Sequence, residues 1–201
     1  LPALRAAISP PVDHDLLREQ PALRQVVFIT DGAVGNELAL FEEIADRLGD
    51  TRLFTVGIGS APNSWFMRKA ADFGRGTHTH IGDLNEVGQK MGQLFEQLAA
   101  PAAVDLAIDW PLPVEAWPER VPDLYSGEPV VVAVSFGSVQ PTGEVTVRGK
   151  LAGAAWNKTL TLVPPDKGTA LNQHAGVASL WARQKITGLL DQKVFGRSEE
   201  Q

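Results

Sequence analysis

The residues best placed for chemistry are Thr30, Asp31 and Gly32, which directly follow the apolar run of residues 26–29. Carboxylate and hydroxyl oxygens are the ligands that hard divalent cations such as Mg²⁺ prefer. Asp and Gly are also standard turn residues, and on spacing alone a plain turn is the more common outcome. The stretch therefore has two interpretations, a turn or part of a metal site, and Asp31 is the candidate ligand.

The elements around Asp31 are predicted to form a parallel sheet. A continuous apolar run is typical of a strand buried on both faces, and we predict such a strand over residues 25–30. Further strands are predicted over 53–58 and 77–81. Helices are expected to follow the three strands, with N-caps at Asn36, at Asn63 or Ser64, and at Asp83. This β-α-β-α-β-α order over residues 24–100 indicates a doubly wound sheet with right-handed crossovers. Ligand sites in such sheets lie just past the carboxyl ends of strands, where Asp31 is.

Two helices of this first half carry predictions about their surfaces. The helix that begins at Asp83 is expected to bury an apolar face made of Val87, Met91, Leu94, Phe95 and Leu98. The pair Glu42 and Glu43 is expected on the solvent side of its helix.

The second half of the chain follows a different pattern. Short alternating runs, turns and prolines indicate antiparallel strands, a sandwich or a small barrel. We predict strands over 104–108, 129–136, 145–151 and 156–163. A last helix is predicted over 172–193, with an apolar stripe made of Val177, Leu180, Trp181, Ile186, Leu189 and Leu190. The domain prediction is therefore residues 1–100, the C-terminal half of an α/β domain, and residues 101–201, a β-rich domain ending in a helix.

Composition excludes several classes of function. The net charge is −6 and the pI is about 5.2, which argues against nucleic acid as a partner because phosphate binding needs a basic face. The chain has no cysteine, so disulfides, thiolate catalysis and zinc–thiolate sites are excluded.

Other motifs are weaker. Gly57-Ile58-Gly59 resembles the start of a dinucleotide fingerprint, but Pro62 stands at the third glycine position. His78 and His80 share one face of a strand, but without a nearby carboxylate we expect partly exposed strand residues rather than metal ligands. Neither Ser60 nor Ser64 lies in a nucleophile elbow. No enzyme signature stands out.

Residues 27–37, Val-Phe-Ile-Thr-Asp-Gly-Ala-Val-Gly-Asn-Glu, together with residues 53–59, Leu-Phe-Thr-Val-Gly-Ile-Gly, resemble a von Willebrand factor A domain. The Thr-Asp-Gly-x-Val-Gly-Asn-Glu form is similar to the inter-alpha-trypsin inhibitor heavy chain family and its bacterial relatives, in which a VIT domain precedes the A domain. Residues 123–129 and 180–186 resemble the β-rich segment after that domain.

The resemblance implies a metal-ion-dependent adhesion site that binds Mg²⁺ through Asp-x-Ser-x-Ser, a Thr on a later loop, and an Asp after the fourth strand. Asp31 matches the last of these, and no Asp-x-Ser-x-Ser occurs in the chain. We therefore expect this chain to be a piece of a longer protein, and to hold no ordered Mg²⁺ at Asp31. The family's strand order also implies a bare edge on the strand of residues 26–30, which would favour self-association unless another segment covers it.

The resemblance implies a non-enzymatic adhesion or protein-binding function, with a protein ligand bound through Mg²⁺ in the intact parent. That parent would be a bacterial protein of the cell envelope, or a secreted one. One alternative is a hydrolase that uses Asp31 as nucleophile or metal ligand. Another is a purely structural module.

Overall fold

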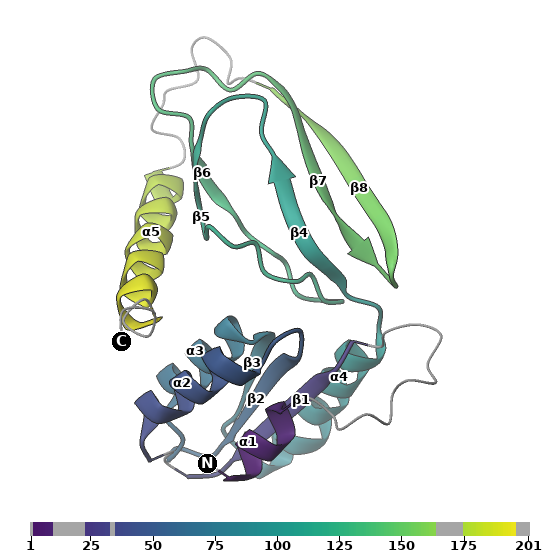
Figure 1. Ribbon diagram of the computed structural model, residues 1–201, viewed down its shortest axis with the longest axis vertical. Coiled ribbons are helices and arrows are strands. Elements are labelled where there is room, and N and C mark those ends of the chain that lie inside the picture. The colour runs from purple at the N-terminus through teal and green to yellow at the C-terminus, as the bar shows by residue number, and fades with distance from the viewer. Residues whose placement is uncertain (1, 10–22, 33–34, 164–174, 196–201) are drawn as a thin grey trace. The chain divides into compact units, whose positions relative to one another are not determined.

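The structure is a computed structural model that describes residues 2–9, 23–32, 35–163 and 175–195 (Figure 1). Backbone contacts divide the chain into two compact units, Leu1–Ala100 and Pro101–Gln201. Each unit has its own sheet and is described by itself. Within the described residues, no helix is both long and apolar enough to cross a membrane.

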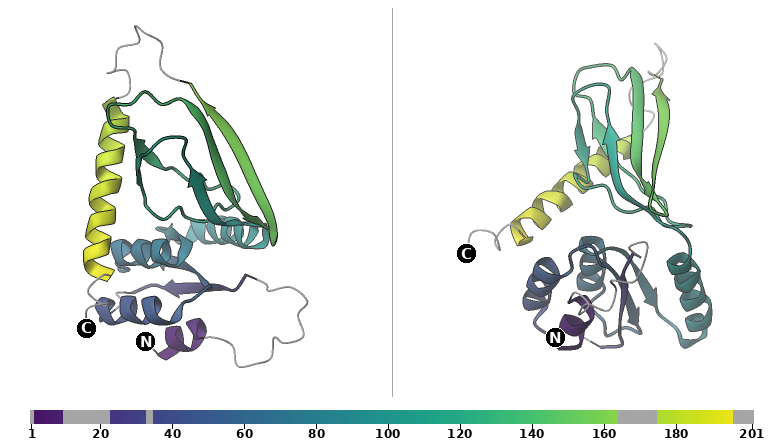
Figure 2. Two further views of the ribbon diagram at one scale, coloured as in Figure 1. Left: turned by 45° about the horizontal axis from the view of Figure 1, so that its top comes forward. Right: turned by 45° about the vertical axis from the view of Figure 1, so that its right-hand side comes forward.

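The first unit is a parallel three-stranded sheet with helices on both faces. The order is β1-β2-β3, and both strand pairs are parallel. Its elements are α1 (Pro2–Ile8), β1 (Gln25–Thr30), α2 (Glu37–Arg47), β2 (Arg52–Ile58), α3 (Ser64–Phe73), β3 (Arg75–Ile81), the 3₁₀ turn η1 (Leu84–Glu86) and α4 (Val87–Ala99). Helices α2 and α3 lie on one side of the sheet and α4 on the other (Figure 2). The predicted α/β order is confirmed from β1 to α4.

Strand β2 is the centre of this unit. Its apolar run is buried, and the side chains of Phe54 and Val56 have no exposed surface. Phe66 and Met67 of α3 are equally buried, because α3 packs on both β2 and β3. The sequence pattern of a strand buried on both faces therefore applies to β2, which has a neighbouring strand on each side.

The same prediction is wrong for β1. Its first four residues are half-buried, and Ile29 is 50% exposed. The reason is its place in the sheet: among the described strands β1 pairs with β2 alone and forms the edge. Four consecutive apolar residues are compatible with a central strand, but the order of strands in the sheet decides whether the strand is central or at the edge.

The predicted apolar face of α4 is also only partly buried. Leu94 is buried, whereas Val87, Met91 and Leu98 are partly buried and Phe95 is 57% exposed. In this unit α4 packs chiefly on β3. A sheet of three strands gives this helix too little surface to cover its whole apolar side.

Helix starts differ from the predicted N-caps in two places. Asn63 caps α3 as expected, since its Oδ1 accepts from the backbone N–H groups of Trp65 and Phe66 at 3.1 and 3.2 Å. Asn36 does not cap α2: its φ of 58° lies in the left-handed region, and its side chain makes no capping hydrogen bond. Side-chain capping needs an extended backbone. Asp83 caps η1 instead of an α-helix.

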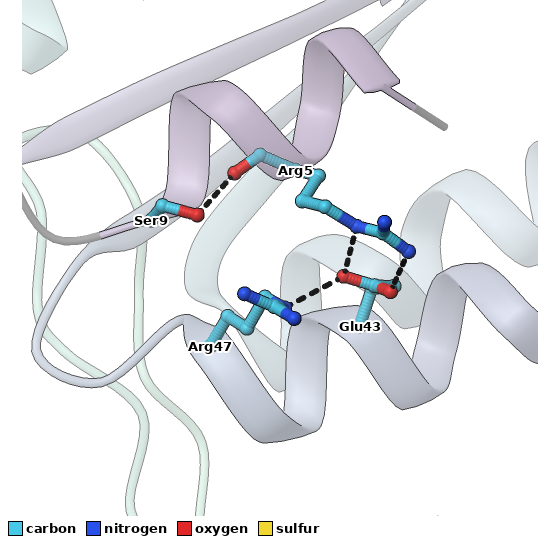
Figure 3. Close-up of polar contacts among 4 residues, drawn as sticks. All are labelled: Arg5, Ser9, Glu43 and Arg47. Atoms are coloured by element: carbon cyan, nitrogen blue, oxygen red, sulfur yellow. Dashed lines mark hydrogen bonds and ion pairs between the residues drawn. The ribbon is translucent and has the colours of Figure 1, made fainter.

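Glu43, which was expected on the solvent side of its helix, links two helices instead. Glu43 on α2 accepts hydrogen bonds from the Arg5 guanidinium on α1, one of them at 2.9 Å, and also pairs with Arg47 at 2.9 Å (Figure 3). The hydrogen bond from Arg5 is the main cause that holds the pKa of Glu43 below its usual value. The side chain of Glu43 is therefore a structural anchor for α1.

The second unit contains two antiparallel sheets and a helix. The three-stranded sheet has the order β4-β7-β8, and the second sheet pairs β5 with β6. The elements are β4 (Ala103–Asp109), β5 (Glu115–Trp117), β6 (Ala133–Ser135), β7 (Gly143–Leu151), β8 (Ala154–Leu162) and α5 (Ala175–Phe195). Antiparallel strands followed by a helix confirm the predicted fold class. Strand β5 was not predicted, and the strand expected over 129–136 shrinks to β6. Residues 172–174 of the predicted helix lie outside the described residues.

Helix α5 docks on β5 and β6 through polar groups. The Gln184 amide accepts from Ala133 N–H at 3.2 Å and donates to the Val131 carbonyl at 3.1 Å, as a neighbouring strand would. The Trp181 indole N–H donates to the Glu115 carbonyl at 3.2 Å, and Lys185 pairs with the Glu115 carboxylate at 2.6 Å.

The predicted apolar stripe of α5 is mostly exposed. Val177, Ile186 and Leu190 are each more than half exposed, and Leu180 and Leu189 are also exposed. Trp181 is the member of the predicted stripe that bonds to the sheet, and Gln184, Lys185 and Gly188 face the sheet with it.

Candidate functional site

Asp31 lies at the carboxyl edge of the parallel sheet. Thr30, Gly57 and His80 are paired across β1, β2 and β3, and Asp31 is the next residue after Thr30. The Thr30 hydroxyl lies 3.3 Å from the Gly32 N–H and 3.2 Å from the Gly32 carbonyl, which closes a tight turn over Asp31. The Asp31 side chain is exposed. The predicted turn is therefore present, and the Asp31 side chain is exposed on it.

The other carboxylates near this edge already have partners. Glu37 in the first turn of α2 accepts from the Asn63 amide at 2.6 Å. Asp83 accepts from the Asn85 N–H at 2.8 Å. Each of these oxygens holds a helix start in place, which leaves Asp31 as the exposed carboxylate at the end of β1.

These residues do not by themselves fit a Mg²⁺ ion. Mg²⁺ needs near-octahedral oxygen coordination and gives up its water reluctantly. In the described part of the chain, no group of three or more His, Cys, Asp or Glu residues could hold a metal. Asp31 supplies one carboxylate, and the Thr30 hydroxyl beside it is engaged with Gly32.

The contact between Glu37 and Asn63 was missed by sequence analysis. It joins the amino-terminal ends of α2 and α3, the two helices that follow β1 and β2. A signal for it exists: both residues stand at the start of the helix that follows a parallel strand, and such positions meet at one edge of the sheet. The two helix starts beside Asp31 are therefore tied to each other.

Gly57, near the end of β2, does not offer the open backbone of a nucleotide site. A Cβ added to Gly57 would lie 3.2 Å from the Pro62 Cβ, so Pro62 packs against the place where a phosphate would need open backbone. Gly59 has a φ of 82° and serves the turn.

The two histidines of β3 have different surroundings. His80 is exposed, whereas His78 is partly buried and pairs with the Thr55 hydroxyl at 2.9 Å. His78 therefore has a threonine hydroxyl of the same unit, and not a serine, as its partner.

The tryptophans of the second unit mostly fill space. Trp117 is 5% exposed, and Trp110 makes an edge-to-face contact with Phe136 at 5.9 Å between ring centroids. Trp156 instead lines a shallow groove of about 520 Å³, together with Leu124, Tyr125, Glu128, Pro129 and Leu151 among others. The lining is mainly apolar, so this groove offers packing rather than catalysis.

Sequence comparison gives relatives of one kind. No protein-family model matches the chain. Two von Willebrand factor A domain-containing proteins of Dictyostelium discoideum are each 28% identical over 134 residues, which is 66% of this chain and 15% and 14% of the relatives. A third protein of that description from the same organism is 25% identical over 126 residues. The chain thus spans about one seventh of the length of these curated relatives.

Two solved structures are also similar. The ArnB paralog VWA2 from Sulfolobus acidocaldarius is 21% identical with a TM-score of 0.47, over 88% of this chain and 51% of that one. A von Willebrand factor type A structure from Catenulispora acidiphila is 18% identical with a TM-score of 0.44, over 77% of this chain and 46% of that one. Similarity at this level carries no argument about function. The Dictyostelium relatives, together with the parallel sheet of the first unit, support a von Willebrand factor A domain in this chain.

Proposed function

We propose that this chain is part of a non-enzymatic protein-binding module, and that Asp31 is one ligand of a Mg²⁺ adhesion site completed by residues outside these 201. Von Willebrand factor A domains are generally protein-interaction modules. The observation that carries the proposal is the exposed Asp31 carboxylate at the carboxyl end of β1, beside an edge that has no strand partner among the described residues.

The position of Asp31 favours ligand binding over hydrolysis. A carboxylate on an exposed turn is accessible to a metal ion and to a protein surface together. A nucleophilic aspartate needs a general acid or base held within hydrogen-bond reach, and the nearby Glu37 and Asp83 oxygens are engaged in holding helix starts. A location at the cell envelope or outside the cell, and a preceding VIT domain, belong to the same proposal.

The test uses the longer parent protein with the residues that precede Leu1. Isothermal titration with Mg²⁺ should show one saturable site that Asp31→Ala removes. Asp83→Ala at the same sheet edge is the matched control and should retain the site. Binding of Mg²⁺ that is unaffected by Asp31→Ala would contradict the proposed role of Asp31. Hydrolysis of p-nitrophenyl esters or phosphates that Asp31→Ala abolishes would favour the enzyme alternative.

We further propose that the bare edge of β1 pairs with a second copy when nothing else covers it. Unpaired strand edges with apolar side chains are templates for association. A charge on the edge should prevent it, so Ile29→Lys is expected to shift the 201-residue chain toward monomer. Phe95→Lys is the control, because Phe95 is also exposed, at 57%, but lies on α4.

Light scattering over a range of concentrations measures the effect. We expect an oligomer for the unaltered chain and for Phe95→Lys, and a lower mass for Ile29→Lys. A monodisperse monomer of the unaltered chain at every concentration would overturn this part of the proposal.

A further inference from the structure

A buried chain of hydrogen bonds joins α3, β2 and β3. The Thr55 hydroxyl on β2 lies 2.8 Å from the Met67 carbonyl on α3 and 2.9 Å from Nδ1 of His78 on β3. Thr55 and Met67 have no exposed surface. These two hydrogen bonds form a polar contact that ties α3 to the two strands beneath it.

The geometry decides where the protons are. A carbonyl can only accept, so the single hydroxyl proton of Thr55 is donated to Met67. The Thr55 oxygen must then accept from His78, which requires a proton on Nδ1. Neutral His78 is therefore held as the Nδ1–H tautomer, and its Nε2 carries a lone pair and no proton.

Protonation of His78 would place the second ring proton on Nε2, where nothing among the described residues accepts it. The atom is buried and has no hydrogen-bond partner among the described residues. The charged or titratable groups that act on the ring are Arg68 on α3 and His80 on β3, and both disfavour a positive charge. From β2 the ring meets Thr55, which does not titrate, and α4 packs on the other face of β3, where Thr77 donates to Gln97 at 3.3 Å.

We propose that His78 is a pH-sensitive latch, which holds α3 on β2 and β3 while its ring is neutral and releases them when Nε2 is protonated. Burial is the main cause that lowers the pKa of His78. A hydrogen bond with the Thr55 backbone opposes it in part, and the charges of Arg68 and His80 lower the pKa further.

The direction of the effect follows from linkage. The unfolded chain takes up a proton near the ordinary histidine pKa of 6.5, whereas the folded first unit takes it up only at lower pH. The contribution of His78 to the stability of the first unit is therefore complete well above pH 6.5, and it falls as the pH drops toward the pKa of the folded state. The unfolding equilibrium constant of the first unit is expected to rise by up to about tenfold per pH unit in that interval.

The first measurement is nuclear magnetic resonance on the unaltered chain. The ¹⁵N shifts of His78 should show the Nδ1–H tautomer at pH 7.5, and its titration midpoint should lie below the ordinary histidine value of 6.5. An Nε2–H tautomer, or a midpoint at or above 6.5, overturns the proposal without any variant.

The second measurement is urea unfolding of the first unit between pH 5 and pH 7.5, followed by hydrogen exchange of β2 and α3. His78→Asn keeps an N–H donor for Thr55 but cannot titrate, so it should lose the acid-dependent rise in the unfolding constant. His80→Asn, two residues away on the same strand, should keep it. If His78→Asn shows the same pH dependence as the unaltered chain, the latch is not His78.

Discussion

Phe54→Ala is expected to lower the free energy of unfolding of the first unit by about 3–5 kcal/mol, the usual cost of a large cavity left by a buried aromatic ring. Phe54 has no exposed surface and lies on β2, the strand with neighbours on both sides. A loss of this size is comparable with the total stability of a marginal domain, about 5–15 kcal/mol.

The matched control is Phe95→Ala, the same substitution at a side chain that is 57% exposed. It should change stability by no more than about 0.5 kcal/mol. Urea unfolding followed by circular dichroism, with hydrogen exchange of β2 to assign the transition to the first unit, gives both values. Equal losses for the two variants would mean that β2 is not the core.

Trp117→Ala is expected to cost the second unit a similar amount, about 3–5 kcal/mol. Trp117 is 5% exposed and packs against α5 where Gly188 leaves space for its ring. A Cβ added to Gly188 would lie 2.4 Å from Cζ3 of Trp117. We therefore expect the ring to help hold the middle of α5 against β5, beside the polar contacts of Trp181 and Lys185.

A double-mutant cycle checks that contact. In the unaltered chain, Gly188→Ala should destabilise, because overpacking against the ring costs about 1–3 kcal/mol and outweighs the better helix propensity of alanine. In the Trp117→Ala background the same change should stabilise by up to about 1 kcal/mol, since only the propensity remains. Gly176→Ala on the same helix meets no described residue within 4 Å and should be stabilising in both backgrounds. Additive effects of Trp117→Ala and Gly188→Ala would contradict the contact.

Much of the first unit follows from its sequence because its signals are local. The apolar run of β2 and the Asn63 cap depend on a few neighbouring residues, and both were predicted. The half-exposed β1 was not, because an identical apolar run is buried or bare according to how many strands lie beside it. The partly bare face of α4 has the same cause.

The misses in the second unit have a different origin. Strand β5 is three residues long, too short to show an alternating pattern, and its place depends on pairing with β6. The side of α5 that docks is chosen by Gln184 bonding to backbone groups around β6. Such long-range hydrogen bonds leave no periodic trace. The apolar stripe therefore predicted the docking side of α5 correctly at Trp181 and wrongly at its exposed aliphatic residues.

The candidate site likewise combines features that depend on neighbouring residues with features that depend on long-range contacts. The position of Asp31 after a strand could be predicted from the local pattern, as could its likeness to one part of an adhesion site. The cap at Asp83 was predicted as well, although it begins the 3₁₀ turn η1 instead of an α-helix. The hydrogen bond between Glu37 and Asn63 was not predicted, because it joins two helix starts that lie 26 residues apart in the chain.

The most direct test of the account is a Mg²⁺ titration of the 201-residue chain itself by calorimetry, beside the Asp31→Ala variant. One exposed carboxylate cannot supply the oxygen ligands that Mg²⁺ requires. The two titrations should therefore superimpose, with no saturable heat at millimolar Mg²⁺. A one-to-one saturable site in the unaltered chain that disappears in Asp31→Ala would show that these 201 residues hold the metal unaided, and would contradict the proposal that the site is completed from outside them.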